Sequence, residues 1–252
     1  SMTEENLTTE QYQEVKEYLN SWEAIFAKDD MDLGHTDAVK HKIVLTDQVP
    51  FKQKFRRIPP GMFQELKQHL QQMMDCDVIR PSHSPWASNI VPVRKKDGKL
   101  RFCIDYRQLN QRTIKDAYAI PRMEDTLDLL HGKKWFSTLD LKAGYWQVDL
   151  EEESKPCTAF TVGPLGLFEA NRLAFGLTNS PATFQRLMEQ VLDGLNMRIC
   201  LVYLDDIIIF SDSYEEHLEH LQAVFERIQS YGLKLNAAKC KFFQREVKYL
   251  GH

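Results

Sequence analysis

The feature that most constrains the fold is the stretch from Cys200 to Phe210, in which nine apolar residues surround the adjacent pair Asp205 and Asp206. Each flank is a short β-rich run with no polar face, so two strands buried in a sheet are predicted. The aspartate pair falls where a two-residue turn would reverse the chain. The sequence therefore predicts a hairpin that carries two carboxylates at the edge of a sheet.

The surroundings of this pair favour a bound cation. Two carboxylates about 4 Å apart repel by roughly 4 kcal/mol at an effective dielectric constant of 20, so both stay ionised only beside a cation or in open water. The sequence has no lysine or arginine between Arg198 and Arg227. Mg²⁺ prefers one or two carboxylates, waters and substrate phosphates. An ordinary solvated turn is the alternative, because aspartate is common in turns.

A second acid, Asp140, is predicted at the end of the strand that begins at Trp135. The residues Ala143 and Gly144 follow as a tight turn. Strand ends at a sheet edge are where ligand sites are built, so Asp140 could complete a site for two metal ions with the hairpin pair. The acids after it, Asp149 and 151–153, are predicted to form a solvated turn.

Composition limits the class of protein. A chain of 252 residues that is 43% hydrophobic can bury the core of one large domain or two lobes. It has no apolar run of the ~18 residues that a membrane span needs, and its N-terminus is acidic, so we expect no membrane partner and a cytoplasmic protein, with a virus-like particle or the nucleus as alternatives. The five cysteines lack a CxxC pair and are predicted to be free, buried thiols. Zinc is disfavoured, because His217 and His220 are expected to face solvent.

The charge is distributed unevenly along the chain. The net charge is -4, but residues 1–37 hold ten acids and two bases, which leaves +4 on the remainder. Bases cluster at 52–57, 94–101 and 234–248. Any one cluster could be a solvated face, but three of them together with an acidic hairpin favour a phosphate backbone as partner.

Periodicity and caps predict an α+β sandwich with an antiparallel sheet. Helices are predicted after a capping box of Thr8 and Gln11, from Phe63, from an N-cap at Ser180, and from an N-cap at Ser213 to Gly232. Residues 34–60 are predicted to be extended chain. Strands are predicted at 89–93 and 99–104 around a turn at 96–98, and at 167–173, 233–235, 242–243 and 247–250.

Several motifs together resemble the reverse transcriptases of gypsy-class long-terminal-repeat retrotransposons. The resemblance covers residues 30–252 and rests on the segments 85–88, 95–98, 101–110, 136–148, 175–185, 203–206 and 249–252. It implies an α+β right-hand polymerase, with fingers and a palm whose ferredoxin-like antiparallel sheet packs on helices. The expected division is an acidic helix and extension at 1–37, fingers with early palm segments at 38–134, and palm at 135–252, with a fingers insertion at 150–172 left open. The natural chain is expected to continue into thumb, connection and RNase H domains.

The same resemblance implies the residues of the site. The catalytic and metal-binding residues would be Asp140, Asp205 and Asp206, with the Leu141 backbone, around two Mg²⁺ or Mn²⁺ ions. The nucleotide would contact Lys95, Arg101, Ala143, Gly144, Tyr145, Phe175 and Gly176. Primer and template would contact Tyr203, Gln185, Tyr249, Leu250, Gly251 and His252. Asp105 and Arg107 are expected to form a structural ion pair.

The activity implied is that of an RNA-directed and DNA-directed DNA polymerase, which adds dNTPs to a primer on an RNA or DNA template by two-metal phosphoryl transfer. Tyr145 would exclude ribonucleotides. The alternative is a domesticated, catalytically silent module that binds nucleic acid or another partner, and a third reading is an RNA-dependent RNA polymerase. The intact acids Asp140, Asp205 and Asp206 argue against the silent module.

Overall fold

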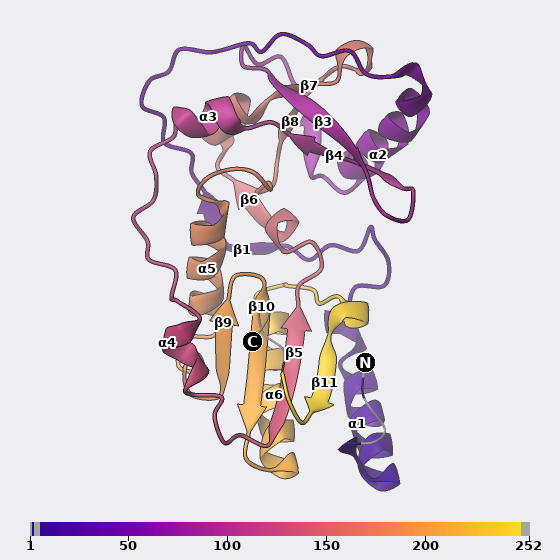
Figure 1. Ribbon diagram of the computed structural model, residues 1–252, viewed down its shortest axis with the longest axis vertical. Coiled ribbons are helices and arrows are strands. Elements are labelled where there is room, and N and C mark those ends of the chain that lie inside the picture. Colours follow the sequence, from indigo (N-terminus) through magenta and orange to yellow (C-terminus); the bar gives the residue numbers. More distant parts are fainter. Residues whose placement is uncertain (1, 3–5, 248–252) are drawn as a thin grey trace. The chain divides into compact units, whose positions relative to one another are not determined.

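The structure, a computed structural model, describes residue 2 and residues 6–247 (Figure 1). The chain divides into two compact units, each made of separate segments. Unit 1 comprises Ser1–Thr36, Tyr118–Gly144 and Phe184–His252, and unit 2 comprises Asp37–Ala117 and Tyr145–Thr183. The boundaries expected for fingers and palm, at residues 37 and 134, stay a prediction.

Unit 1 is built on a four-stranded antiparallel sheet, in the order β11-β5-β10-β9 (Figure 1). The central pair is β10 (Asp206–Ser211) and β5 (Trp135–Asp140), flanked by β9 (Cys200–Tyr203) and β11 (Lys241–Gln244). Ile207, Ile208 and Ile209 are all buried. Both faces of β10 are therefore covered, which explains its continuous apolar run and confirms the predicted buried hairpin.

Helices cover both faces of this sheet. The helix α6 (Tyr214–Ser230) packs on β10 and β5. On the other face, Leu127 of α4 (Glu124–Leu127) packs against Phe136, Ile208 and Phe210. Near β11 lies α1 (Thr9–Ser21), followed by the 3₁₀ segment η2 (Glu23–Ile25); a further 3₁₀ segment, η8 (Ala237–Lys239), precedes β11.

Most of the predicted helix ends are confirmed. Thr8 and Gln11 form the reciprocal capping box of α1, and Ser213 caps α6 by accepting a hydrogen bond from the Glu216 amide at 3.1 Å. The predicted cap of α5 (Ser180–Val191) is wrong by one residue. The helix already includes Ser180, whose hydroxyl donates to the Ala174 carbonyl.

Unit 2 contains a five-stranded sheet in the order β2-β8-β7-β3-β4. Its strands are β2 (Ile79–Pro81), β3 (Ser88–Arg94), β4 (Leu100–Ile104), β7 (Phe160–Thr161) and β8 (Leu167–Ala170). The strands β3 and β7 are parallel and the other pairs are antiparallel. The predicted hairpin is confirmed as β3–β4, in which Lys95 and Lys99 bracket the turn through the 2.9 Å bond from the Lys95 amide to the Lys99 carbonyl.

The remainder of unit 2 consists of short elements. A two-stranded sheet pairs β1 (Thr36–His41) with β6 (Val148–Leu150), so part of the predicted extended segment 34–60 is a strand. The helix predicted from Phe63 is confirmed as α2 (Phe63–Asp75), which buries Leu66, Leu70 and Met73. The helix α3 (Arg107–Gln111) and the 3₁₀ segments η3 (Pro60–Met62), η4 (Gly144–Gln147), η5 (Glu152–Ser154), η6 (Pro156–Thr158) and η7 (Gly163–Leu165) complete the chain.

Three sequence predictions need correction. The acids after β5 do not form a plain solvated turn, because Asp149 lies in β6 with its carboxylate 3.3 Å from Arg172 Nε, and Glu152 pairs with Arg80 at 2.6 Å. Leu235 forms isolated bridges instead of a strand at 233–235. All five cysteines are free, but Cys103 is exposed and Cys76 half-buried.

Two further points concern the helices and the C-terminal residues. Within 6–247, no helix is long and apolar enough to cross a membrane. The strand predicted at 247–250 falls largely outside the described residues, as do the predicted site residues Tyr249 to His252.

Candidate active site

The pairing of β5 with β10 brings the three predicted acids together. Asp206 lies directly opposite Asp140 in the antiparallel ladder, and Asp205 precedes Asp206 in the hairpin turn. Residues directly opposite each other in such a pair have Cβ atoms about 4.5–5.5 Å apart. Asp140 and Asp206 are therefore close enough for their carboxylates to share one cation or a pair of cations, and Asp205 adds a third carboxylate next to Asp206.

The hairpin turn lies one residue earlier than predicted. Tyr203 pairs with Asp206, so the two turn residues are Leu204 and Asp205, and Asp206 is the first residue of β10. Leu204 has a φ of 53°, a left-handed conformation that is uncommon for a branched residue. The apolar flanks hid this offset, because either register buries the same isoleucines.

A buried amide holds this turn in place. The carbonyl oxygen of Gln185, on α5, accepts a hydrogen bond from the Leu204 amide at 2.9 Å. Its NH₂ group donates to the Val202 carbonyl at 3.3 Å and to Glu189 at 3.1 Å. Gln185 is 0% exposed. The predicted contact of Gln185 with primer or template is therefore corrected, because its side chain binds the strained turn that presents Asp205.

All three carboxylates lie in surroundings that disfavour their charge. Burial, together with the nearby Asp206 and Asp205, raises the pKa of Asp140 from 3.8 to about 6. Burial also raises the pKa of Asp205, and burial followed by repulsion from Asp205 raises that of Asp206. A bound cation would favour the ionised form of these three carboxylates. Their donor atoms are all oxygens, which Mg²⁺ and Mn²⁺ prefer as ligands.

A base that the sequence reading missed lies near these acids. Lys239, at the end of η8, offsets part of the rise in the pKa of Asp140, Asp205 and Asp206 that burial causes. Its segment is anchored at the end of β5, because the Asn236 amide donates to the Asp140 carbonyl at 2.8 Å. The basic cluster 234–248 was the available signal, but its proximity to the acids depends on this long-range contact.

The turn after β5 is tight for two separate reasons. The residue with a left-handed backbone conformation is Ala143, with a φ of 45°, rather than Gly144. A Cβ on Gly144 would lie 2.8 Å from the ring of Phe184, so this glycine allows close packing. Leu141 is buried and forms an isolated bridge with Leu235. A metal contact through the Leu141 backbone stays a prediction.

In unit 2, four of the predicted nucleotide contacts line one cavity of about 630 Å³. They are Lys95, Arg101, Phe175 and Gly176. Phe175 is 69% exposed, and its ring centroid lies 4.7 Å from that of the buried Tyr145.

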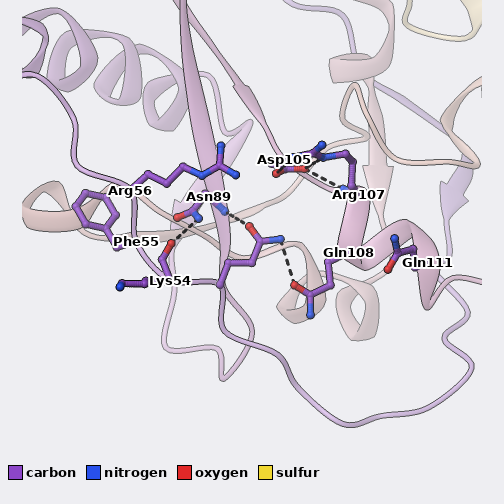
Figure 2. Close-up of a pocket in the computed structure, with 9 residues that line it drawn as sticks. Lys54, Phe55, Arg56, Asn89, Asp105, Arg107, Gln108 and Gln111 are labelled. Carbon is purple, nitrogen blue, oxygen red and sulfur yellow. Dashed lines mark hydrogen bonds and ion pairs between the residues drawn. The ribbon is translucent and has the colours of Figure 1, made fainter.

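A second cavity of unit 2, of about 840 Å³, is polar and basic (Figure 2). The expected pair of Asp105 and Arg107 is confirmed there, with two bonds of 2.9 Å, and Arg107 lowers the pKa of Asp105. Asn89 is buried, and its Oδ1 has no hydrogen-bond partner among the described residues. The lining residues are Gln53, Lys54, Phe55, Arg56, Asn89, Asp105, Arg107, Gln108 and Gln111. Sequence reading gave the basic segment 52–57 but not this cavity.

The comparisons with known proteins agree with this geometry. The model of the family "Reverse transcriptase (RNA-dependent DNA polymerase)" matches residues 93–252, and the chain belongs to this family. The chain is 39% identical to the retrovirus-related Pol polyprotein from transposon 297 of Drosophila melanogaster, over 98% of this chain and 24% of that protein. It is 34% identical to the enzymatic polyprotein of cauliflower mosaic virus strain CM-1841, over 99% of this chain and 37% of the relative.

Solved structures give the same result. A foamy viral protease-reverse transcriptase in complex with RNA/DNA hybrid matches 98% of this chain and 33% of its own, with a TM-score of 0.89 and 26% identity. A foamy viral protease-reverse transcriptase dRH in complex with double-stranded DNA gives a TM-score of 0.86 at 26% identity and covers 98% of this chain and 44% of that one. The resemblance and the α+β fold of polymerase fingers and palm are confirmed. The chain spans about a quarter to two fifths of the two curated relatives named above.

Proposed function

We propose that this chain is the catalytic part of an RNA-directed and DNA-directed DNA polymerase. The observation that carries the proposal is the register that sets Asp206 opposite Asp140, beside Asp205, in a chain of the reverse transcriptase family. Three half-buried carboxylates with raised pKa values have little structural use without a cation.

Asp140, Asp205 and Asp206 would hold two Mg²⁺ ions, with Mn²⁺ as a substitute and the Leu141 backbone as a further ligand. Bound metal ions activate a primer hydroxyl and stabilise the charge that develops during phosphoryl transfer. The chain's own contribution is to fix the carboxylates: the ladder sets Asp140 against Asp206, and Gln185 fixes the turn that carries Asp205. Lys239 offsets part of the repulsion among the acids.

The resemblance implies which residues would bind the incoming dNTP. Lys95 and Arg101 lie on the exposed β3–β4 hairpin, where cationic side chains keep the freedom to close over a triphosphate. The backbone amides of Ala143 and Gly144 would bind phosphate oxygens from a tight turn. Tyr145, with Phe175 and Gly176, would shape the space around the sugar and exclude a 2′-hydroxyl.

The nucleic acid partner would be an RNA or DNA template with its primer. The larger cavity of unit 2 offers Lys54, Arg56 and Arg107 to phosphates, and its amide side chains to bases. Tyr203 and the segment 249–252 are proposed to contact the primer. The solved relatives in complex with RNA/DNA hybrid and with double-stranded DNA support this class of partner.

Primer extension tests the proposal. The chain is incubated with an RNA template, a labelled DNA primer, dNTPs and Mg²⁺, and an Asp206→Asn variant is assayed in the same way as a control. We expect extension that follows the template, requires the metal and is lost in the control. A wild-type chain that binds the duplex but does not extend the primer, with Mg²⁺ or with Mn²⁺, would instead favour the silent nucleic-acid-binding module.

A further inference from the structure

A fully buried histidine on α6 connects three strands of the sheet that carries the acids. His217 is 0% exposed. Its Nε2 lies 2.7 Å from the hydroxyl of Ser137 on β5, and its Nδ1 lies 2.7 Å from the hydroxyl of Ser211 on β10. Ser137 also accepts a hydrogen bond from the Phe243 amide of β11 at 3.1 Å. One imidazole ring thus links α6 to β5, β10 and, through Ser137, β11.

The expectation that His217 faces solvent is wrong. Helical spacing places His217 one turn before Leu221, so it lies on the buried stripe, whereas Leu218 is only half-buried. The buried ring packs edge to face on Phe243, with centroids 4.7 Å apart. Composition hid this role, because a histidine among glutamates is usually solvated.

The ring acts as a neutral group with fixed bonds. Burial lowers the pKa of His217 to about 3, so the imidazole stays uncharged throughout the physiological range. A neutral imidazole has one donor and one acceptor nitrogen, so in either tautomer it donates to one serine and accepts from the other. His220 supports this arrangement, because its Nδ1 lies 2.8 Å from the Phe210 carbonyl and 3.0 Å from the Ser211 hydroxyl.

The two serines lie on the same two strands as the acids. Ser137 is three residues before Asp140 on β5, and Ser211 is five residues after Asp206 on β10. The neighbours of the serines on this face include the buried Leu139 and Ile209. The backbone ladder sets the register of β5 against β10, whereas the apolar contacts of this face are not directional and add little resistance to a small slide of one strand along the other. Hydrogen bonds of 2.7 Å to both strands resist such a slide.

We propose that His217 is a positioning residue for the acid cluster. By bonding one serine on each strand, it reinforces the offset of β5 against β10 that the backbone ladder sets, and with it the separation of Asp140 from Asp206. The inference rests on the proposed function in one respect, because it assumes that these acids hold metal ions.

The test compares substitutions of matched size. His217→Leu keeps the bulk but loses both hydrogen bonds, while His217→Gln keeps a donor and an acceptor. Val224→Ala removes buried volume from the same helix without touching the serines, and so controls for lost stability. Mn²⁺ affinity is measured by electron paramagnetic resonance, and hydrogen–deuterium exchange follows the amides of β5 and β10.

We expect His217→Leu to weaken Mn²⁺ binding about fivefold per folded molecule, less than the ten- to hundredfold typical of groups that bond a metal ligand directly. Exchange should quicken in β5 and β10. His217→Gln should recover most of both properties, and Val224→Ala should melt earlier but bind Mn²⁺ like the wild type. Wild-type Mn²⁺ affinity and exchange in folded His217→Leu would overturn the proposal.

Two other outcomes are also decided. If His217→Leu does not fold, Ser211→Ala, which removes one of the two bonds, is measured in its place and must show the same effects at smaller size. If the wild-type chain itself binds no Mn²⁺, the proposed metal site fails, whereas the exchange rates of β5 and β10 still decide whether His217 reinforces their offset.

Discussion

The two hairpins that carry the predicted site residues are built in opposite ways. The β9–β10 hairpin of unit 1 holds half-buried acids on buried strands, and Gln185 fixes its turn. The β3–β4 hairpin of unit 2 carries its bases on exposed positions from Arg94 to Lys99. The acids are held in a fixed arrangement that resists charge until a cation binds, whereas the bases are exposed to solvent.

The ion pair on the basic hairpin is exposed to solvent. Arg94 pairs with Glu65 at 3.2 Å, but both side chains are more than 40% exposed. An exposed pair of this kind contributes about 0–1 kcal/mol, so it does not hold the basic hairpin rigidly. Substitutions in the acidic hairpin should therefore abolish chemistry, and substitutions in the basic hairpin should weaken a binding step.

The largest expected effect is that of Asp205→Asn. Loss of one carboxylate from the metal cluster should lower primer extension by more than about a thousandfold, while duplex binding stays near normal. The melting temperature in metal-free buffer should hold or rise, because repulsion is relieved. Asp212→Asn, an exposed acid at the far end of β10, is the matched control. Extension near the wild-type rate in Asp205→Asn would exclude this acid from the metal site.

Tyr145→Val, in unit 2, tests whether Tyr145 determines the selectivity for the sugar of the nucleotide. If the phenol ring excludes the 2′-hydroxyl, the ratio of kcat/KM for rNTP over dNTP should rise by about tenfold or more, since each ~1.4 kcal/mol of relieved clash is a factor of ten. Tyr145→Phe keeps the ring and should leave the ratio unchanged. A lower melting temperature with an unchanged ratio in Tyr145→Val would show that Tyr145 serves only packing.

Arg101→Ala should produce a smaller, more selective loss. The dNTP KM should rise by about tenfold, because one charge-assisted bond to the triphosphate is removed, while duplex affinity stays constant. Arg94→Ala, on the same hairpin but paired with Glu65, should change the KM little. If duplex affinity falls in Arg101→Ala and the KM does not change, Arg101 contacts the template.

The acidic hairpin should also respond to pH. Metal binding requires ionised carboxylates, so the Mg²⁺ concentration for half-maximal extension should rise as the pH falls through about 6, the pKa of Asp140. Asp205 and Asp206 also have raised pKa values and should add to this dependence. If the Mg²⁺ concentration for half-maximal extension stays constant between about pH 5 and pH 7, the raised pKa values are contradicted.

The smallest effect concerns stability without metal. Folded Asp140 keeps its proton up to about pH 6, whereas the unfolded chain releases it near 3.8. The folded state therefore binds more protons in this window, and stability should fall as the pH rises from about 4 to 6. After discounting for partial exposure, the change is about 1 kcal/mol. Asp140→Asn should flatten this part of the curve in urea titrations, and an unchanged slope would contradict the assignment.

Local signals in the sequence predicted much of the fold. The capping box of Thr8 and Gln11, the cap at Ser213 and the turn of the β3–β4 hairpin depend on neighbouring residues, and all three are confirmed. The apolar run around the two acids predicted buried strands correctly. These local roles were thus recognised from the sequence, whereas the cap predicted at Ser180 is off by one residue.

The residues that position the site were not predictable in this way. Gln185 holds a turn 19 residues away, and His217 bonds Ser137 across 80 residues. Their burial depends on tertiary contacts that override the polarity of the side chain. The offset of one residue in the β9–β10 turn escaped prediction for a related reason, since Leu204 adopts a backbone conformation that leucine normally avoids.

The most direct test of the metal site is anomalous diffraction from crystals of the chain grown with Mn²⁺ and a dNTP. The arrangement of Asp140, Asp205 and Asp206 predicts Mn²⁺ peaks within coordination distance of these carboxylates, and their loss in Asp206→Asn. Well-ordered crystals that contain Mn²⁺ elsewhere, or the nucleotide without metal at these three acids, would contradict the account.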